Sequence, residues 1–153
     1  MNILFFITPK SEVKYLHDYY TIRQAIEKLE DNRYTSIPVI DDQGKYVSTI
    51  TEGDILWKIK NDFKNEKYEL NIDSLETMSI KDINKYNNYE TVSASSDMEN
   101  LIDLAKHQNF IPVVDDQNIF IGIIKRSDII AYFNISLNSK KTSKSVSKVS
   151  WFK

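Results

Sequence analysis

The chain contains the stretch Ile37-Pro38-Val39-Ile40-Asp41-Asp42-Gln43 and, 74 residues later, its near copy Ile111-Pro112-Val113-Val114-Asp115-Asp116-Gln117. The same shift of 74 residues carries Ile50–Leu56 onto Ile124–Ile130. Two blocks that keep one spacing indicate a duplicated unit of roughly sixty residues. Because a unit of this size buries too little surface to be stable alone, we expect two copies packed about a pseudo-twofold axis, with clefts between them.

Composition and the start of the chain favour an ordinary globular protein. With 153 residues, 41% hydrophobic and 27% charged, the chain fits one compact domain or two paired half-domains. It has no cysteine and only two histidines, so disulfide bonds are excluded and a structural zinc site is not expected. The apolar run Met1–Ile7 is too short to cross a bilayer and lacks the basic leader of a signal peptide. We therefore expect a short helix docked on the core, no membrane contact and a cytoplasmic protein.

The end of the chain differs in charge from the rest. Residues 135–153 contain five lysines and no acid, whereas the whole chain has a net charge of −2, so the remaining residues carry −7. This segment is rich in serine and lysine with little periodicity, and we predict a disordered basic tail. Because its lysines are scattered and not interleaved with aromatics, nucleic acid is not expected as a partner.

Each copy begins with an amphipathic helix. Thr21 and Gln24 have the form of a capping box at the first helix, and Ser96 and Glu99 have that form at the second. Apolar residues then follow at helical spacing. They are Ile22, Ala25, Ile26 and Leu29 in the first copy, and Met98, Leu101, Ile102 and Ala105 in the second, which corresponds to a shift of 76.

A β-hairpin and a second helix follow in each copy. The hairpins pair strands 37–40 with 46–50 and 111–114 with 119–124, with Gly44 and Asn118 supplying the positive φ of the turns. Final helices are predicted at 52–60 and 126–133, and one further strand precedes each unit, at 13–16 and 89–92. The resulting order is strand, helix, strand, strand, helix, twice.

The predicted fold class is therefore α/β (α+β), with two β-α-β-β-α repeats packed with pseudo-twofold symmetry through their sheets. The first repeat spans residues 1–60 and the second 77–134. Residues 61–76 form a polar linker with some helical potential, and residues 135–153 are the tail.

These motifs together resemble a tandem pair of cystathionine-β-synthase (CBS) domains, also called a Bateman module, over residues 1–134. The resemblance is carried by the hydrophobic-Pro-Val-hydrophobic-Asp strand, its turn, and the Gly-hydrophobic-hydrophobic-Ser/Thr-x-x-Asp segment that opens the last helix. It implies a stand-alone regulatory protein, not an enzyme, which binds an adenosine compound between its repeats. It also implies a homodimer and an effector protein that the sequence does not identify. No cofactor is required, and the regulatory ligand is AMP, ADP, ATP, cyclic di-AMP or S-adenosylmethionine.

The resemblance places the ligand in two clefts. In the family, the Asp of the last segment holds the ribose hydroxyls, and the first strand and the residues just before Pro-Val of the opposite repeat clamp the adenine. The first cleft would use Thr51, Asp54, Tyr89, Glu90, Phe110, Ile111 and Pro112. The second cleft would use Lys125, Arg126, Asp128, Val13, Lys14, Tyr15, Ile37 and Pro38.

Three positions depart from the family pattern, so the two clefts are not expected to be equivalent. Ser48 replaces the glycine that Gly122 retains. Lys125 stands where a Ser or Thr is expected, which removes a hydroxyl and adds a cation. Glu90 would repel a phosphate if it faced the first cleft.

Two alternatives remain open from the sequence. An aspartate in the first turn of a helix, such as Asp54 or Asp128, is stabilised by the helix dipole without any ligand. The segment Thr51–Asp54 also approximates a helix cap. The alternative to a nucleotide sensor is thus a structural dimerisation module whose own side chains fill the clefts. No nucleophile elbow, phosphate-cradling glycine loop or Rossmann fingerprint occurs, and three glycines in the whole chain are too few for the last two.

Overall fold

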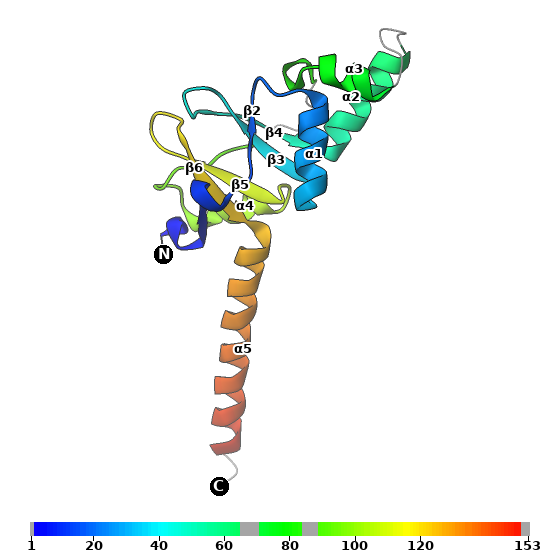
Figure 1. Cartoon of the computed structure of the whole chain (residues 1–153). Coiled ribbons are helices and arrows are strands. Elements are labelled where there is room, and N and C mark those ends of the chain that lie inside the picture. The colour runs from blue at the N-terminus through cyan, green and yellow to red at the C-terminus, as the bar shows by residue number, and fades with distance from the viewer. Residues whose placement is uncertain (1, 65–70, 84–88, 151–153) are drawn as a thin grey trace.

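The computed structural model describes residues 2–64, 71–83 and 89–150, with side chains as far as residue 142. The first repeat contains β2 (Leu16–His17), α1 (Ile22–Asn32), β3 (Ser36–Ile40), β4 (Tyr46–Thr51) and α2 (Glu52–Lys64). The second contains α4 (Met98–Ala105), β5 (Phe110–Val114), β6 (Phe120–Lys125) and α5 (Arg126–Ser150). The linker carries α3 (Ile72–Thr77) and the 3-10 turn η3 (Ile80–Asp82), and the chain begins with η1 (Ile3–Phe6), β1 (Ile7–Pro9) and η2 (Lys10–Glu12). Figure 1 shows the two repeats side by side, with α5 extending away from them.

The strands form two three-stranded sheets, one for each repeat. In the first sheet the order is β2-β3-β4, with β2 parallel to β3 and β3 antiparallel to β4. In the second sheet the order is β1-β6-β5, and both pairs are antiparallel. The hairpins carry the same irregularity at equivalent places, after Val39 and after Val113. Gly44 and Asn118 have φ of 79° and 64°, so the predicted turn residues are confirmed.

The N-terminal strand crosses to the other repeat. β1 pairs with β6, so that Pro9 lies opposite Gly122 and Ile7 opposite Ile124. Gly122 is needed at this contact because a Cβ there would lie 2.3 Å from the backbone oxygen of Thr8. The sequence predicted a short docked helix at the start of the chain, which η1 provides by burying Ile3 and Phe6. It did not predict the strand after it.

Contacts between equivalent residues locate the pseudo-twofold axis. The Asn109 side-chain amide donates to the Thr35 hydroxyl at 3.2 Å, and Lys45 pairs with Ile119 in an antiparallel bridge. Each pair is 74 positions apart, so each contact joins a residue to its own counterpart. Only residues beside a twofold axis can do this. The predicted packing of two repeats through their sheets is therefore confirmed.

Each repeat has its own hydrophobic core, and a third cluster joins them. Leu16, Ile22 and Ile37 are fully buried in the first core, and Leu101 and Ile111 in the second. The joining cluster lies between the sheets and consists of Val13, Ile40, Phe110, Phe120 and Ile123, with three half-buried tyrosines against it. A cleft between the repeats lies beside this cluster, because Val13, Phe110 and Ile123 also line it.

Two predicted details of the second repeat are wrong. The cap of α4 is Asp97, whose carboxylate accepts from the Asn100 N–H at 2.8 Å, and not Ser96, whose hydroxyl accepts from Ser93. The strand predicted at 89–92 is reduced to one bridge between Val92 and Val113. The buried side chain of Gln108 replaces the missing ladder, because its amide accepts from the Glu90 N–H at 2.8 Å and donates to the Glu90 carbonyl at 3.0 Å.

The C-terminal segment also differs from its prediction. Helix α5 runs to Ser150, whereas the sequence predicted a helix ending at 133 and a disordered tail. After Gly122 the chain has no glycine or proline, so no residue breaks the helix once it has begun. In the first repeat α2 likewise runs four residues past its predicted end, to Lys64. Of the helices in the described part of the chain, none combines the length and apolar character needed to cross a membrane.

Candidate functional site

A cleft of about 290 Å³ opens between the two repeats, at the place predicted for the second cleft. It joins the segment before β2, the turn between α1 and β3, and the junction of β6 with α5. The lining residues are Thr8, Glu12, Val13, Lys14, Arg33, Tyr34, Thr35, Ser36, Pro38, Asn109, Phe110, Ile123, Lys125 and Ser127. This volume lies just below the range for small-ligand sites, roughly 300–1,000 Å³.

Its interior walls are apolar. Pro38 lies in β3 and Ile123 in β6, the middle strands of their sheets, and both are buried. Phe110 is the first residue of β5 and belongs to the cluster between the sheets. Flat apolar groups at these positions offer a surface on which a planar base can pack.

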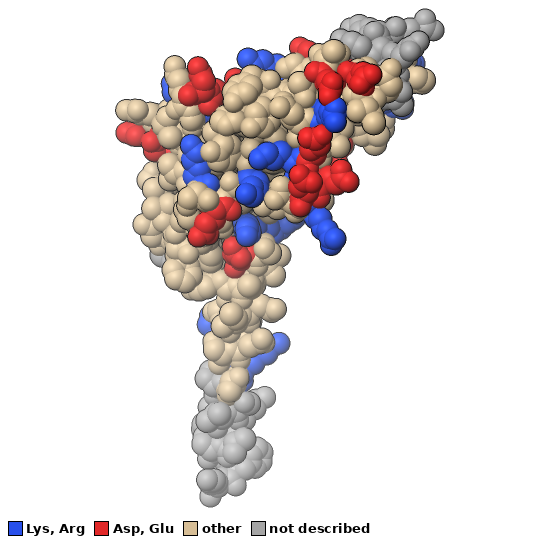
Figure 2. Space-filling view, viewed as in Figure 1, with Lys and Arg blue, Asp and Glu red and all other residues tan. Residues whose placement is uncertain are grey.

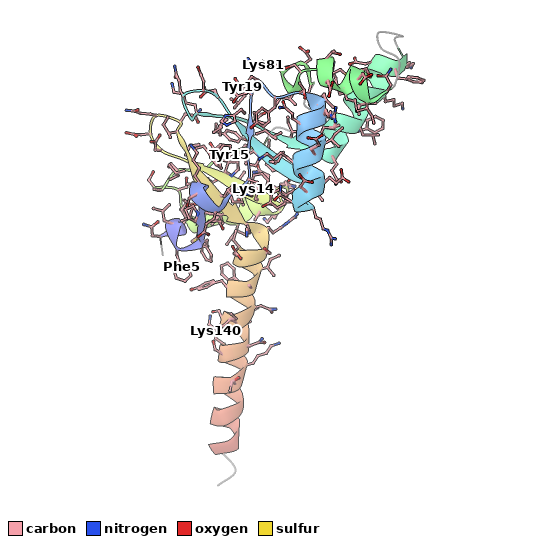
Figure 3. The ribbon with its side chains drawn as sticks, in the orientation of Figure 1. Phe5, Lys14, Tyr15, Tyr19, Lys81 and Lys140 are labelled. Carbon is pink, nitrogen blue, oxygen red and sulfur yellow. The ribbon has the colours of Figure 1, made fainter. Side chains whose placement is uncertain are left out.

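Cations surround the mouth of this cleft. Lys14, Arg33 and Lys125 line it and are exposed, whereas the acid on the lining is Glu12. Arg33 is placed there by the end of α1, where it takes the left-handed conformation with φ of 54° and donates its N–H to Glu30 and Leu29. Figure 3 shows Lys14 beside Tyr15 on this face, and Figure 2 shows basic side chains gathered around that point. The excess positive charge favours an anionic ligand.

Hydroxyl and amide groups complete the lining of the second cleft. Ser36 opens β3, and Thr35 and Asn109 meet at the pseudo-twofold axis. Ser127 lies in the first turn of α5, two residues after Lys125. Lys125 replaces the Ser or Thr of the family pattern, and Ser127 supplies a hydroxyl to the cleft in its place.

Only part of the predicted second cleft comes together. Val13, Lys14, Pro38 and Lys125 line the cavity, and their role in binding stays a prediction. The other four predicted residues lie elsewhere, as follows. Tyr15 lines a neighbouring hollow with Lys10 and His17, Ile37 is fully buried, Arg126 lies on the helical side of the repeat, and Asp128 is exposed on α5.

Among the residues predicted for the first cleft, Thr51 and Asp54 bond to each other across the start of α2. The Thr51 N–H donates to the Asp54 carboxylate at 2.9 Å, and the Asp54 N–H donates to the Thr51 hydroxyl at 3.1 Å. Asp54 is only 2% exposed. This is the capping arrangement that the sequence left open as the alternative to ribose binding.

Aromatic side chains pack together among the residues predicted for the opposite wall of the first cleft. The rings of Tyr89 and Phe110 lie 5.5 Å apart, and both belong to the cluster between the sheets. Ile111 and Pro112 are buried, whereas Glu90 is exposed. The Tyr46 hydroxyl bonds to the Thr49 hydroxyl at 2.8 Å, and burial raises the pKa of Tyr46 to about 12, with nearby Tyr89 adding to the rise and the Thr49 bond opposing it.

Sequence reasoning missed several residues that line the second cleft. Arg33 and Thr35 precede the β3 motif, and Ser127 and Asn109 stand next to predicted positions. A signal was available for Thr35 and Asn109, because they are counterparts under the same 74-residue shift. No comparable sequence pattern distinguishes Arg33, since its position depends on where α1 ends. Among the described residues, no group of three or more His, Asp or Glu side chains could hold a metal ion.

The comparisons with known proteins agree with this architecture. The family model of the CBS domain matches residues 7–61 and 80–135, more than half of the chain. Among curated proteins, the uncharacterized protein MJ1225 of Methanocaldococcus jannaschii is 29% identical over 117 residues, which are 72% of this chain. That match covers 41% of MJ1225, so the chain spans less than half the length of this relative.

Solved structures show the same fold. A crystal structure of CbpB in complex with c-di-AMP matches with a TM-score of 0.77 at 24% identity, covering 94% of this chain and 91% of the other. A crystal structure of CBSX2 in complex with AMP matches with a TM-score of 0.68 at 23% identity, covering 88% and 98%. At sequence identities this low, the matches show the fold alone. The ligand of this chain has to be inferred from its own residues.

Proposed function

The chain belongs to the CBS domain family as a tandem pair of such domains, and from this premise we propose that it is a regulatory module that binds an adenine nucleotide in its second cleft. The observation that carries the proposal is the cleft itself. It has apolar walls between the repeats and three cations at its mouth. This combination suits a ligand with one flat apolar end and one anionic end.

Each part of the cleft has a role in the proposed complex. Pro38, Phe110 and Ile123 pack against the base. Lys14 and Lys125 approach the phosphates from opposite repeats, where charge-assisted hydrogen bonds are strongest. The Ser127 hydroxyl lies in the first turn of α5, where backbone N–H groups also favour an anion.

Relatives of the same fold support the class of ligand. The CbpB structure contains c-di-AMP and the CBSX2 structure contains AMP, and both compounds join adenine to phosphate. Of the compounds compatible with the family, AMP, ADP, ATP and c-di-AMP carry the negative charge that this cleft favours. S-adenosylmethionine is disfavoured because its sulfonium adds a positive charge beside three cations.

Regulation would follow from binding between the repeats. A ligand that contacts both Lys14 and Lys125 binds only the arrangement of repeats that brings these residues together. It therefore stabilises that arrangement by its difference in affinity, and an effector protein that recognises the same arrangement responds.

Thermal unfolding with a panel of nucleotides tests the proposal. We expect AMP, ADP, ATP or c-di-AMP to raise the melting temperature in a concentration-dependent way, and titration calorimetry to give one site per chain. Lys14→Met and Lys125→Met should each weaken binding at least tenfold. Lys81→Met is the matched control, because Lys81 is exposed and far from Lys14 in Figure 3, and it should bind like the unchanged chain. Absence of binding by every nucleotide up to millimolar concentration would refute the proposal.

A purely structural module is the second candidate, and the residues predicted for the first cleft favour it. There Asp54 caps a helix without any ligand, and Tyr89 and Phe110 pack on each other. If both clefts serve only packing, Lys14→Met and Lys125→Met leave melting temperatures unchanged with and without nucleotide. The two candidates thus give different results in one assay.

A further inference from the structure

A second hollow, with a volume of about 470 Å³, lies beside the edge strand β2 of the first sheet. We call it the β2 hollow. It is formed by η2, by the segment that leads into β2, and by the side of α1. Val13 and Lys14 are shared with the lining of the second cleft, and the other residues that line the β2 hollow are its own.

Three lysines line the β2 hollow, and no acid is among its lining residues. Lys10 comes from η2, Lys14 from the segment before β2, and Lys28 from α1. Lys10 and Lys28 are half-buried. In the part of the chain that the structure describes, none of the three forms an ion pair with a carboxylate.

The acids next to this segment in the sequence do not line the hollow. Glu12 lines the second cleft, and the Asp18 carboxylate lies 3.8 Å from the Lys81 ammonium. The lining of the β2 hollow therefore carries three positive charges. Like charges around one hollow repel one another, and a bound anion would offset that repulsion.

Aromatic rings hold the imidazole of His17 in the wall of the β2 hollow. The His17 ring lies parallel to the Tyr19 ring at 5.2 Å between centroids, and edge-on to the Tyr20 ring at 5.3 Å. The Lys10 ammonium lies 5.4 Å from the centre of the Tyr15 ring, which favours its position there. Among the described residues, the buried Nδ1 of His17 has no hydrogen-bond partner. A buried polar atom of this kind marks a place where a ligand can complete the site.

The second repeat has a neutral residue at each position that matches one of the three lysines. The counterparts, under the shift of 74 residues or of 76 within the helix, are Asn84, Asn88 and Leu104. Both repeats nevertheless form the same helix and hairpin. The fold therefore does not require these lysines, which favours a role in binding.

We propose that the β2 hollow binds a small phosphate compound, separately from the nucleotide of the second cleft. The three ammonium groups and the Ser11 hydroxyl donate to the phosphate oxygens, where charge-assisted hydrogen bonds are strongest. A single hollow suits a compact anion better than nucleic acid, whose backbone needs a row of cations along a groove. The inference does not rest on nucleotide binding, since Lys10, His17 and Lys28 do not line the second cleft.

Calorimetric titration of the full chain with pyrophosphate, at constant ionic strength, tests the proposal. We expect one site per chain, and Lys10→Met and Lys28→Met should each weaken binding by roughly tenfold. Lys140→Met is the matched control, because Figure 3 shows Lys140 on α5, far from Lys14. Thermal unfolding checks that each variant is folded. Absence of pyrophosphate binding up to millimolar concentration, or unchanged affinity in both Lys10→Met and Lys28→Met, would overturn the proposal.

Lys125→Met distinguishes the β2 hollow from the second cleft. Lys125 lines only the second cleft, so this variant should bind pyrophosphate like the unchanged chain. If Lys125→Met weakened pyrophosphate binding and Lys28→Met did not, the anion would occupy the second cleft and the proposal would fail. Pyrophosphate binding that depends on Lys28 would support the proposal even if no nucleotide bound to the chain.

The two histidines of the chain report where the anion binds. His17 lines the β2 hollow, whereas His107 is exposed just after α4 and does not line it. In nuclear magnetic resonance spectra of the imidazole groups, pyrophosphate should shift the signals of His17 and leave those of His107 in place. Equal shifts at both histidines would indicate a general effect of ions, and this result would contradict a site in the β2 hollow.

Discussion

Replacing Gly122 by alanine should detach the N-terminal strand from the second sheet. The added Cβ would lie 2.3 Å from the Thr8 carbonyl oxygen and 3.0 Å from two side-chain carbons of Ile7. The carbonyl belongs to the backbone of β1 and cannot turn aside without breaking the pairing with β6. The strand must therefore move as a whole.

The size of the effect follows from overpacking. Inserting a methyl group into a filled site costs roughly 1–3 kcal/mol. For a chain of this length, a loss of about 2 kcal/mol lowers the melting temperature by roughly 4–8 °C. Because Thr8 also lines the second cleft and β1 leads to Lys14, nucleotide binding should weaken as well.

Urea unfolding followed by circular dichroism measures this loss, with Ser48→Ala as the matched control. Ser48 is the counterpart of Gly122, but in the described part of the chain no strand covers the outer edge of β4. Because Ser48→Ala adds no atom to its site, the control avoids the overpacking cost and should lose less stability than Gly122→Ala. If Gly122→Ala lost no more than the control, close contact with β1 would not be the reason for the glycine.

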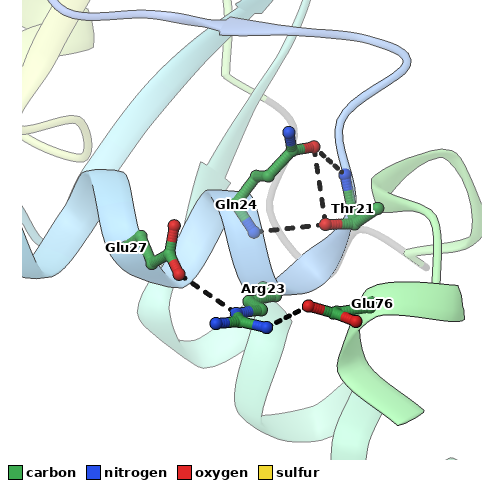
Figure 4. A network of polar contacts seen from close by, with 5 residues as sticks. All are labelled: Thr21, Arg23, Gln24, Glu27 and Glu76. Carbon is green, nitrogen blue, oxygen red and sulfur yellow. Dashed lines mark hydrogen bonds and ion pairs between the residues drawn. The ribbon is translucent and has the colours of Figure 1, made fainter. Parts of the chain in front are cut away.

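Three further predictions concern caps and a buried phenol. Asp54→Ala should lower the free energy of unfolding by about 0.5–2 kcal/mol through loss of the α2 cap, and should leave nucleotide affinity in the second cleft unchanged. Asp128 is exposed, so Asp128→Ala should have a smaller effect on the free energy of unfolding. A tenfold loss of nucleotide affinity in Asp54→Ala would show that Asp54 belongs to the binding site. Thr21→Ala should cost about 1 kcal/mol because it removes the reciprocal bonds with Gln24 drawn in Figure 4. The ion pairs of Arg23 with Glu27 and Glu76 are exposed to solvent and should contribute less than this cap. Urea unfolding of Thr21→Ala and Arg23→Ala measures both losses, and an equal loss in the two would contradict this ranking. Because the pKa of Tyr46 is raised to about 12, the folded chain keeps this phenol protonated above pH 10, while the unfolded chain loses the proton. The free energy of unfolding should therefore fall by about 1.4 kcal/mol per pH unit from pH 10 to 12. Below pH 10 this group should not affect the free energy of unfolding. Tyr46→Phe should remove this part of the alkaline loss, and an identical pH dependence in the variant would refute the assignment.

Much of the fold could be predicted because its signals are local. The Thr21 cap, the apolar helix face and the turn residues Gly44 and Asn118 depend on neighbours within four residues, and the structure confirms them. The duplication itself is visible by comparing the chain with itself. It predicted the facing of the repeats, which the contact of Thr35 with Asn109 confirms. It also predicted the order of elements, except that the strand expected at 89–92 is reduced to one bridge.

The site was predicted less completely because it depends on competition between distant groups. Asp54 has the sequence of a ribose ligand, yet its carboxylate is taken by the Thr51 N–H. The backbone at Glu90 has the sequence of a strand, yet the Gln108 amide occupies its hydrogen-bonding groups. Arg33 enters the second cleft only because α1 ends there in a left-handed residue.

The order of amino acids by itself determined that two like units are joined, where each turns, and which helix positions are apolar. These properties arise from spacing along one chain, where a residue meets partners a few positions away. Only the tertiary structure decided that β1 pairs with the second repeat and that the second cleft gathers three cations. Each of these features depends on which segments, far apart in the sequence, pack against each other. That packing is stabilised by long-range contacts, which leave no pattern in the local sequence.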